Sequence, residues 1–167
     1  MQNGDKEKFS VKRIGGHLHK IIPISDHTGE IINHVISPLM VELRLHDIMQ
    51  IIVGAATLAI PVAFTEEVWN LGERLPLENV LLLSFMSFTF IALFVYYSFY
   101  RNHLKGNVFE YLKRVMATYF LSLLVVAIVL TIIEKCPWGI NNILAIKRII
   151  IVAFPASMAS ALSDSIK

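Results

Sequence analysis

The sequence has little charge and a single cysteine, and these two scarcities exclude several classes of protein. Only 17% of the 167 residues are Asp, Glu, Lys or Arg, and the formal net charge is +2. So small a charge provides no basic surface for nucleic acid, and we expect no nucleic-acid partner. Cys136 alone can form neither an internal disulfide nor a cysteine-based zinc site.

Motifs of catalysis and cofactor binding are also missing. The sequence has no Gly-rich phosphate loop, no HExxH pair, no nucleophile elbow and no paired acid–base constellation. Ser157 and Ser160 have no histidine expected at the same depth of the membrane. The sequence therefore predicts that the protein is not an enzyme and that it has no cofactor and no metal centre.

Apolar residues are abundant and are gathered into long blocks. The hydrophobic fraction is 55% and the mean hydropathy is +0.61. Crossing about 30 Å of hydrocarbon takes roughly 20 mostly apolar residues, and four blocks meet or approach that length. They cover residues 47–69, 80–100, 115–133 and 143–166. The predicted fold is an all-α membrane protein with four transmembrane helices over residues 46–167.

Residues 1–45 contain no such block and are predicted to form a separate arm. The segments HKIIPIS and EIINHVI flank the turn-prone residues 26–29, a pattern typical of a β-hairpin. A lone hairpin is only marginally stable in water, so we expect it to pack against its neighbours or against another subunit.

The distribution of Lys and Arg predicts the orientation of the spans. One side, made of the arm, the connection between the second and third spans, and Lys167, carries eleven of these residues, and the other side carries four. Because positive residues stay on the cytoplasmic side, both termini of this multi-pass cell-membrane protein are predicted to be cytoplasmic.

Small residues recur at every fourth position in the first and last spans, and each of these spans has a central proline. In the first span the small residues are Ala55, Ala59 and Ala63, and the proline is Pro61. In the last span Ala156, Ser160 and Asp164 follow the same spacing, beside Ser157, and the proline is Pro155. Small residues let membrane helices approach closely, and carbonyls freed by proline need partners from protein or water. We therefore expect these two spans to form an inner layer. The prolines either kink the helices only for packing or mark the lining of a path.

Carboxylates near the span ends are the strongest polar candidates. Thr65, Glu66 and Glu67 close the first span, and Glu67 continues the alanine face, so it is expected to point inward. In an oligomer such groups would form a ring that concentrates cations. Alternatively, they are charges at headgroup level that mark a helix end. Asp164 either ends an ion path or pairs with Arg44 or His46, and the pairing is the favoured reading.

Three stretches carry a family resemblance: IVGAATLAIPVAFTEEVWNLG, KRVMATYFLSLLVVAIVLTIIEKCPWG and KRIIIVAFPASMASALSDSI. They resemble a family of small prokaryotic integral membrane proteins of unknown function. The resemblance covers most of the chain after about Met40. Its most specific elements are the TEExW cluster that ends at Trp69 and the FPAS turn followed by Asp164. It implies four spans and no particular activity.

Two functional hypotheses follow from these patterns. In the first, the protein is a homo-oligomeric cation channel or transport-related protein, with the first and last spans lining a path for an inorganic cation. In the second, it is a non-transporting membrane scaffold whose arm docks another protein, and the carboxylates and prolines are structural. Membrane lipid is an expected partner in both.

Overall fold

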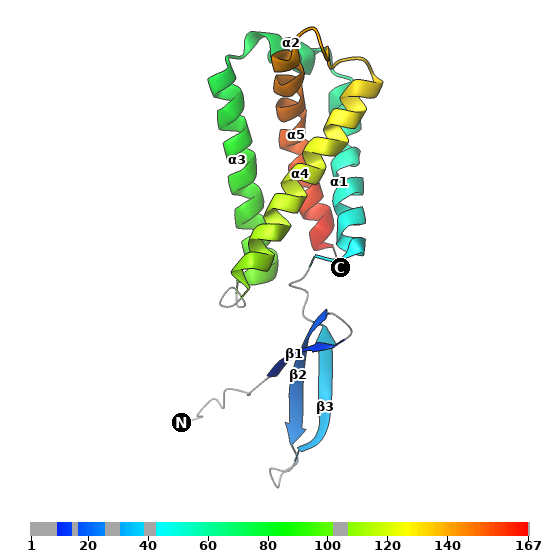
Figure 1. Ribbon diagram of the computed structural model, residues 1–167, viewed down its shortest axis with the longest axis vertical. Helices are drawn as coiled ribbons and strands as arrows, with labels where there is room; N and C mark the ends of the chain where they lie inside the picture. Colours follow the sequence, from blue (N-terminus) through cyan, green and yellow to red (C-terminus); the bar gives the residue numbers. More distant parts are fainter. Residues whose placement is uncertain (1–9, 15–16, 26–30, 39–42, 102–106, 167) are drawn as a thin grey trace. The chain divides into compact units, whose positions relative to one another are not determined.

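The computed structural model describes residues 10–14, 17–25, 31–38, 43–101 and 107–166, which fall into two units. The units are Met1–Glu42 and Leu43–Lys167. Each has its own kind of secondary structure, strands in the first and helices in the second (Figure 1).

The first unit contains a three-stranded antiparallel sheet. Its strands are β1 (Ser10–Ile14), β2 (His17–Ser25) and β3 (Ile31–Pro38), and β2 lies in the middle. Ile22 is opposite Val35 in the β2–β3 pair, which confirms the predicted hairpin. The strand β1, whose Val11 is opposite Lys20, was not predicted. The predicted turn at residues 26–29 lies outside the described residues.

The second unit contains four helices long and apolar enough to cross a membrane, which confirms the predicted fold class. They are α1 (Leu45–Ala63), α3 (Leu77–Val95) with its π-helical extension η1 (Tyr96–Tyr100), α4 (Val108–Ile132) and α5 (Asn142–Ser165). At 1.5 Å per residue the shortest is about 28 Å long, close to the thickness of the hydrocarbon layer.

The first span ends earlier than predicted. The helix α1 stops at Ala63, and a separate short helix, α2 (Glu66–Arg74), follows after Thr65, whose backbone is extended. The hydroxyl of Thr65 donates to the Val62 carbonyl at 2.7 Å, and the indole N–H of Trp69 donates to the Ala63 carbonyl at 2.8 Å. These bonds satisfy carbonyls that the end of a helix leaves without partners.

The helix α5 lies at the centre of the bundle and packs against α1, α2, α3 and α4. Figure 1 shows it between α1 and α3, behind α4. The close pairing of α1 with α5 agrees with the predicted inner layer. The helix α4 differs from that prediction, because it buries a whole face, including Arg114, Thr118 and Ser122. Of the four long helices, α3 buries the smallest share of its residues.

The predicted small-residue face of α1 is buried, as are the small residues of α5. Gly54 marks the closest approach of the two helices: a Cβ placed there would lie 2.6 Å from Ser163 Cβ and 2.7 Å from the Ala159 carbonyl oxygen. Pro155 is half-buried, whereas Pro61 is exposed. Pro61 therefore does not line the interior of the single bundle.

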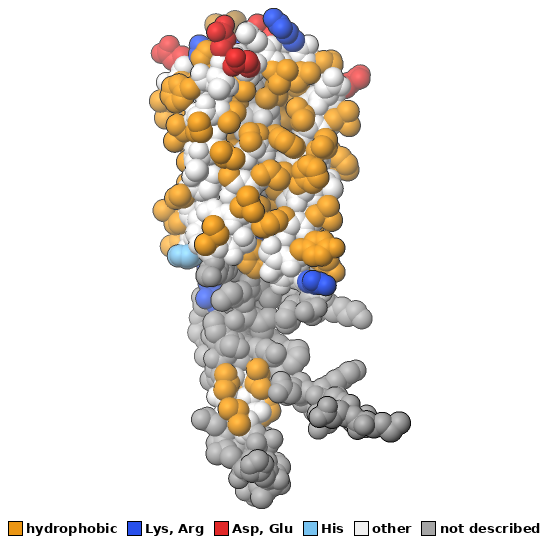
Figure 2. Space-filling view, turned by 180° about the vertical axis from the view of Figure 1, so that it is seen from behind, with side chains coloured by type: hydrophobic (Ala, Val, Ile, Leu, Met, Phe, Trp, Pro, Cys, Tyr) orange, Lys and Arg blue, Asp and Glu red, His pale blue; other side chains and the backbone are white. Residues whose placement is uncertain are grey.

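The surface of the helical unit is that of a protein surrounded by lipid. Large side chains such as Phe85, Phe120 and Leu124 are more than half exposed. Figure 2 shows hydrophobic side chains over the length of the bundle, with acidic and basic side chains gathered towards its ends. In water such a surface would be costly, but in hydrocarbon it needs no cover.

Candidate functional site

Three charged side chains from three helices meet inside the bundle. Arg114 donates from Nη2 to Asp47 Oδ2 at 2.8 Å, and from Nε and Nη2 to the two oxygens of Asp164 at 2.8 and 3.1 Å. Arg114 and Asp164 are completely buried and Asp47 is 2% exposed. We call Asp47, Arg114 and Asp164 the charge cluster.

Each member of the charge cluster comes from an end of its helix. Asp47 lies in the first turn of α1, where its carboxylate also accepts the backbone N–H of Arg44 at 3.1 Å. Asp164 lies in the last turn of α5, and Arg114 in the second turn of α4. A carboxylate suits the positive end of a helix but not the negative end. Asp164 therefore depends on its two-bond contact with Arg114 more than Asp47 does.

Aromatic residues cover the guanidinium of Arg114. Its Cζ lies 3.9 Å from the centre of the Phe99 ring, a geometry that stabilises a cation. Tyr100 is fully buried, and its ring lies 5.3 Å from that of Tyr111. Phe99 and Tyr100 belong to the π-helical turn η1, a local distortion that is frequent at functional sites.

A row of buried hydroxyls leads from the charge cluster towards the middle of the bundle. Its members are Thr118 and Ser122 of α4, Ser160 and Ser157 of α5, and Ser87 of α3. The oxygens of Ser122 and Ser160 are 2.8 Å apart, and those of Ser157 and Ser87 are 2.6 Å apart. Thr118 donates to the Arg114 carbonyl, and Ser160 to that of Ile51. We call this row the hydroxyl track.

Beyond the hydroxyl track the interior is apolar. The buried residues there are Ala59, Ala63, Val126, Leu130, Cys136, Ala145, Ile149, Val152, Ala153 and Ala156, which we call the apolar core. Burial raises the pKa of the Cys136 thiol. The apolar core offers no hydrogen bond that would extend the track across the whole bundle.

A second ionic contact holds α2 over the apolar core. Arg148 of α5 donates to Glu73 at 2.7 Å and to the Lys135 carbonyl at 2.8 Å. The Lys135 ammonium lies 3.8 Å from the centre of the Trp69 ring. The position of Gly72 leaves room for Arg148, because a Cβ there would lie 2.6 Å from Arg148 Cγ. The contact with Lys135 gives Trp69, the tryptophan of the TEExW pattern, a structural role.

The candidate residues of the sequence analysis fall in two places. Thr65, Glu66 and Glu67 are exposed at the start of α2, so Glu67 does not continue the buried alanine face. The prediction that it points inward is wrong, because the helix breaks between Ala63 and Glu66. Ser157, Ser160 and Asp164 are buried, as members of the hydroxyl track and the charge cluster.

The partner of Asp164 is Arg114, so the predicted pairing with Arg44 or His46 is wrong. From the sequence, Arg114 is expected among the charges that flank a span, and Asp47 is expected to have no role. One signal was available: Arg114, Thr118 and Ser122 recur at every fourth position and so share a helical face. Within the described ranges, no group of three or more His, Cys, Asp or Glu residues could hold a metal ion.

Comparison with known proteins identifies the family of the chain. Residues 26–163 match the family model described as "Putative integral membrane protein (DUF2391)". No curated protein and no solved structure matches the chain. The matched region contains every member of the charge cluster except Asp164, and all of the hydroxyl track. The protein therefore belongs to the DUF2391 family of integral membrane proteins.

Proposed function

We propose that the protein is a cation-transport protein of the membrane, that the proton is the cation it moves, and that the charge cluster is its proton-binding centre. The observation that carries this proposal is the complete burial of two carboxylates and one guanidinium at the end of the hydroxyl track. Ionisable groups inside a membrane are costly, and they commonly mark ion pathways and proton relays.

The formal charges of the charge cluster favour uptake of a cation. One guanidinium faces two carboxylates, which leaves a formal charge of −1 on the three side chains. In an interior of low dielectric constant, an added positive charge would be strongly attracted to such a group. Arginine keeps its own proton, so the two carboxylates are the groups that can accept one.

The hydroxyl track suits a proton better than a larger ion. Its paired oxygens are only 2.6 and 2.8 Å apart, so a metal cation could enter only by separating the helices. A hydroxyl both donates and accepts hydrogen bonds, so a proton could pass between the two members of each bonded pair, and the side chains would have to rearrange to carry it from one pair to the next. The exposed His46 lies beside the charge cluster, with its Nδ1 4.0 Å from Asp47 Oδ1.

The apolar core closes the bundle at the other end, so transport requires a second arrangement of the helices or a path completed by another copy. We include a homo-oligomer in the proposal for this reason. The orientation with both termini in the cytoplasm also belongs to it, and it places the charge cluster near the cytoplasmic face. The burial of Arg114 removes one charge from the connecting loop, but Arg101, Lys105 and Lys113 still support this orientation.

The test is proton flux into liposomes that contain the purified protein and a pH-sensitive dye. An imposed pH gradient with a permeant counter-ion should change the internal pH only when the wild-type protein is present. Asp164→Asn should abolish this flux. A double variant, Glu66→Gln with Glu67→Gln, should leave it unchanged, because these carboxylates are exposed and lie outside the charge cluster.

Two results would overturn the proposal. The first is a folded wild-type protein that carries no proton current at any imposed pH gradient or voltage. The second is an Asp164→Asn variant with full flux. If the Glu66 and Glu67 double variant lost flux and Asp164→Asn did not, the cation site would lie at the α2 end of the bundle.

A further inference from the structure

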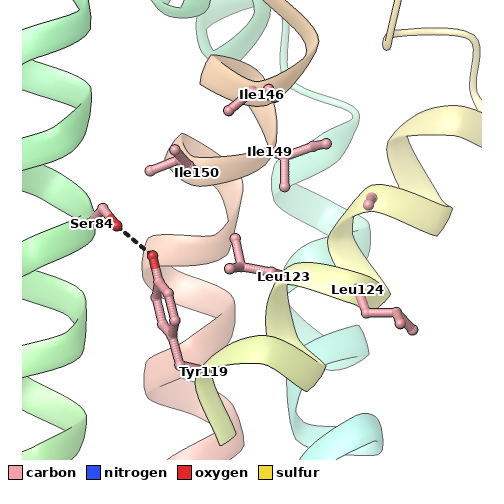
Figure 3. A pocket seen from close by; sticks show the side chains of 8 residues that line it. Ser84, Tyr119, Leu123, Leu124, Ile146, Ile149 and Ile150 are labelled. Carbon is pink, nitrogen blue, oxygen red and sulfur yellow. Dashed lines mark hydrogen bonds between the residues drawn. The ribbon is translucent and has the colours of Figure 1, made fainter. Parts of the chain in front are cut away.

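A groove on the outside of the helical unit lies between three helices. It has a volume of about 510 Å³ and is lined by residues of α3, α4 and α5. In Figure 3, Leu123 and Leu124 of α4 lie on one side, Ile146, Ile149 and Ile150 of α5 line the back, and Ser84 of α3 lies on the other side. Five of the eight lining residues are Leu or Ile, and the other three are Ala127, Ser84 and Tyr119.

The two polar side chains of the groove are bonded to each other. The hydroxyl oxygens of Ser84 and Tyr119 are 2.5 Å apart, and Figure 3 shows this bond joining α3 to α4. The Tyr119 ring is fixed by an edge-to-face contact with Phe88, at 5.9 Å between ring centres. Because one of the two hydroxyls donates to the other, the groove has little hydrogen-bonding capacity left, and its lining favours an apolar occupant.

We propose that this groove binds one acyl chain of an anionic phospholipid. The groove lies on spans that cross the bilayer, so hydrocarbon chains are the medium that borders it. A groove left empty would lose dispersion contacts along its whole lining, whereas a chain seated there regains them. The branched side chains of α4 and α5 present a surface that a flexible chain can follow.

The size of the groove favours an acyl chain over a helix of a second copy. Three turns of helix about 10 Å across would occupy roughly 1,300 Å³. The groove holds well under half of that volume. A second copy could therefore insert no more than side chains into the groove.

A lysine adjacent in sequence to a lining residue of the groove suggests which headgroup the lipid carries. Lys147 is adjacent in sequence to the lining residue Ile146 and is half-buried in the second turn of α5. Among the described residues it forms no ion pair. A phosphate or other anionic headgroup would supply the missing counter-charge. The proposed lipid thus has its chain beside Ile146 and Ile150 and its headgroup beside Lys147.

The experiment measures lipid retention by the full-length protein. Wild-type protein is delipidated, mixed with equal amounts of phosphatidylglycerol and phosphatidylcholine, and analysed by native mass spectrometry. One phosphatidylglycerol should be retained per chain. Ala127→Trp places a large side chain in the groove and should remove this lipid, whereas Ala56→Trp, on α1 and outside the groove, should not. Lys147→Gln should keep a bound lipid but lose the preference for phosphatidylglycerol.

A second measurement decides the matter if Ala127→Trp does not fold. Phosphatidylglycerol with a photoreactive group on its acyl chain should cross-link wild-type protein at Leu123 or Ile150. Cross-links spread evenly over α1 and α3 would overturn the proposal, because they would indicate ordinary boundary lipid. Retention by Ala127→Trp equal to that of wild type would also overturn it, as would protection of the groove by a second copy in lipid-free protein.

Discussion

The two ends of the helical bundle are built on different principles. At the end where α1 begins and α5 ends, the interior holds the charge cluster and the hydroxyl track. At the end covered by α2, the interior is apolar, and charged residues such as Glu73 and Lys135 lie at its rim. In a soluble protein, polar and apolar residues are separated between the surface and the interior. In this bundle, the interior itself changes from polar to apolar along the membrane normal.

This difference has an energetic consequence. In a membrane, apolar packing gains little from the hydrophobic effect, because lipid tails are as apolar as leucine. The α2 end is therefore held by close packing and the charged end by paired ionic groups. Substitutions at the charged end should cost more than substitutions of similar size at the α2 end, and the predictions below test that order.

The largest loss of stability is expected for Arg114→Ala. The change leaves the carboxylates of Asp47 and Asp164 buried without the guanidinium, and breaking such a buried network costs about 3–5 kcal/mol. Chemical denaturation in mild detergent or bicelles measures the change. Lys113→Ala is the control on the same helix, because the Lys113 side chain is 53% exposed and its contact with Glu110 spans 3.9 Å. An Arg114→Ala variant as stable as this control would contradict the ionic account of the charged end.

A smaller loss is expected for Leu130→Ala at the α2 end. Leu130 is fully buried in the apolar core, and its truncation leaves a cavity. The cost should be about 2 kcal/mol, the lower end of the range for such changes, because no transfer from water is involved. Leu124→Ala, which is 55% exposed to lipid, should cost less. If Leu130→Ala costs more than Arg114→Ala, the proposed order of the two ends is reversed.

The close contact of α1 with α5 should tolerate no side chain at Gly54. Gly54→Ala places a Cβ 2.6 Å from Ser163 Cβ, and overpacking of this kind costs about 1–3 kcal/mol. Val53→Ala changes a neighbour that is 60% exposed and provides the comparison on the same turn. The same denaturation assay applies, and an unchanged midpoint for Gly54→Ala would show that the helices are further apart than described.

The ionic contact at the α2 end should matter little. Glu73→Gln removes the partner of Arg148, but the Glu73 side chain is 56% exposed, and a pair of this kind contributes about 0.2–1 kcal/mol. The exposed Glu67 gives a matched variant, Glu67→Gln, for which no change is expected. A loss for Glu73→Gln as large as that for Arg114→Ala would place a second critical ionic site at this end.

The least perturbing probe of the α2 end is Cys136. The thiol is buried and its pKa is raised, so the reactive thiolate is scarce near neutral pH. Alkylation of the folded protein by iodoacetamide should be slow at pH 7, and it should accelerate only above the pH range usual for a cysteine. Denaturant should remove both effects. Rapid labelling of the folded protein at pH 7 would indicate that the apolar core is open.

The spans could be predicted from sequence because hydrocarbon imposes one simple requirement on any segment that crosses it. The helix ends could not be predicted as well. The third span was expected to start at residue 115, but α4 begins at Val108, because a helix can continue through charged residues once they pair inside the bundle. Conversely, α1 ends at Ala63 although the apolar pattern continues through Val68 and Trp69.

The candidate site could be predicted only in part, for a related reason. The small residues of α5 and Asp164 share one helical face, and a face is a local property that spacing reveals. The members of the charge cluster are distant from one another in sequence, since Arg114 lies 50 residues before Asp164 and Asp47 lies 67 residues before Arg114. Which charge enters the interior depends on how three helices pack, and this cannot be determined from one segment at a time.

The most direct test of the charge cluster as a working centre separates its ionic role from its packing role. The variant that combines Asp47→Asn, Arg114→Met and Asp164→Leu replaces the ions by groups of similar size and keeps an acceptor at the start of α1. Replacement of a complete buried ionic network is often neutral or stabilising. We predict a folded, thermally stable protein that conducts no protons in liposomes. Wild-type proton flux through that variant would contradict the central claim.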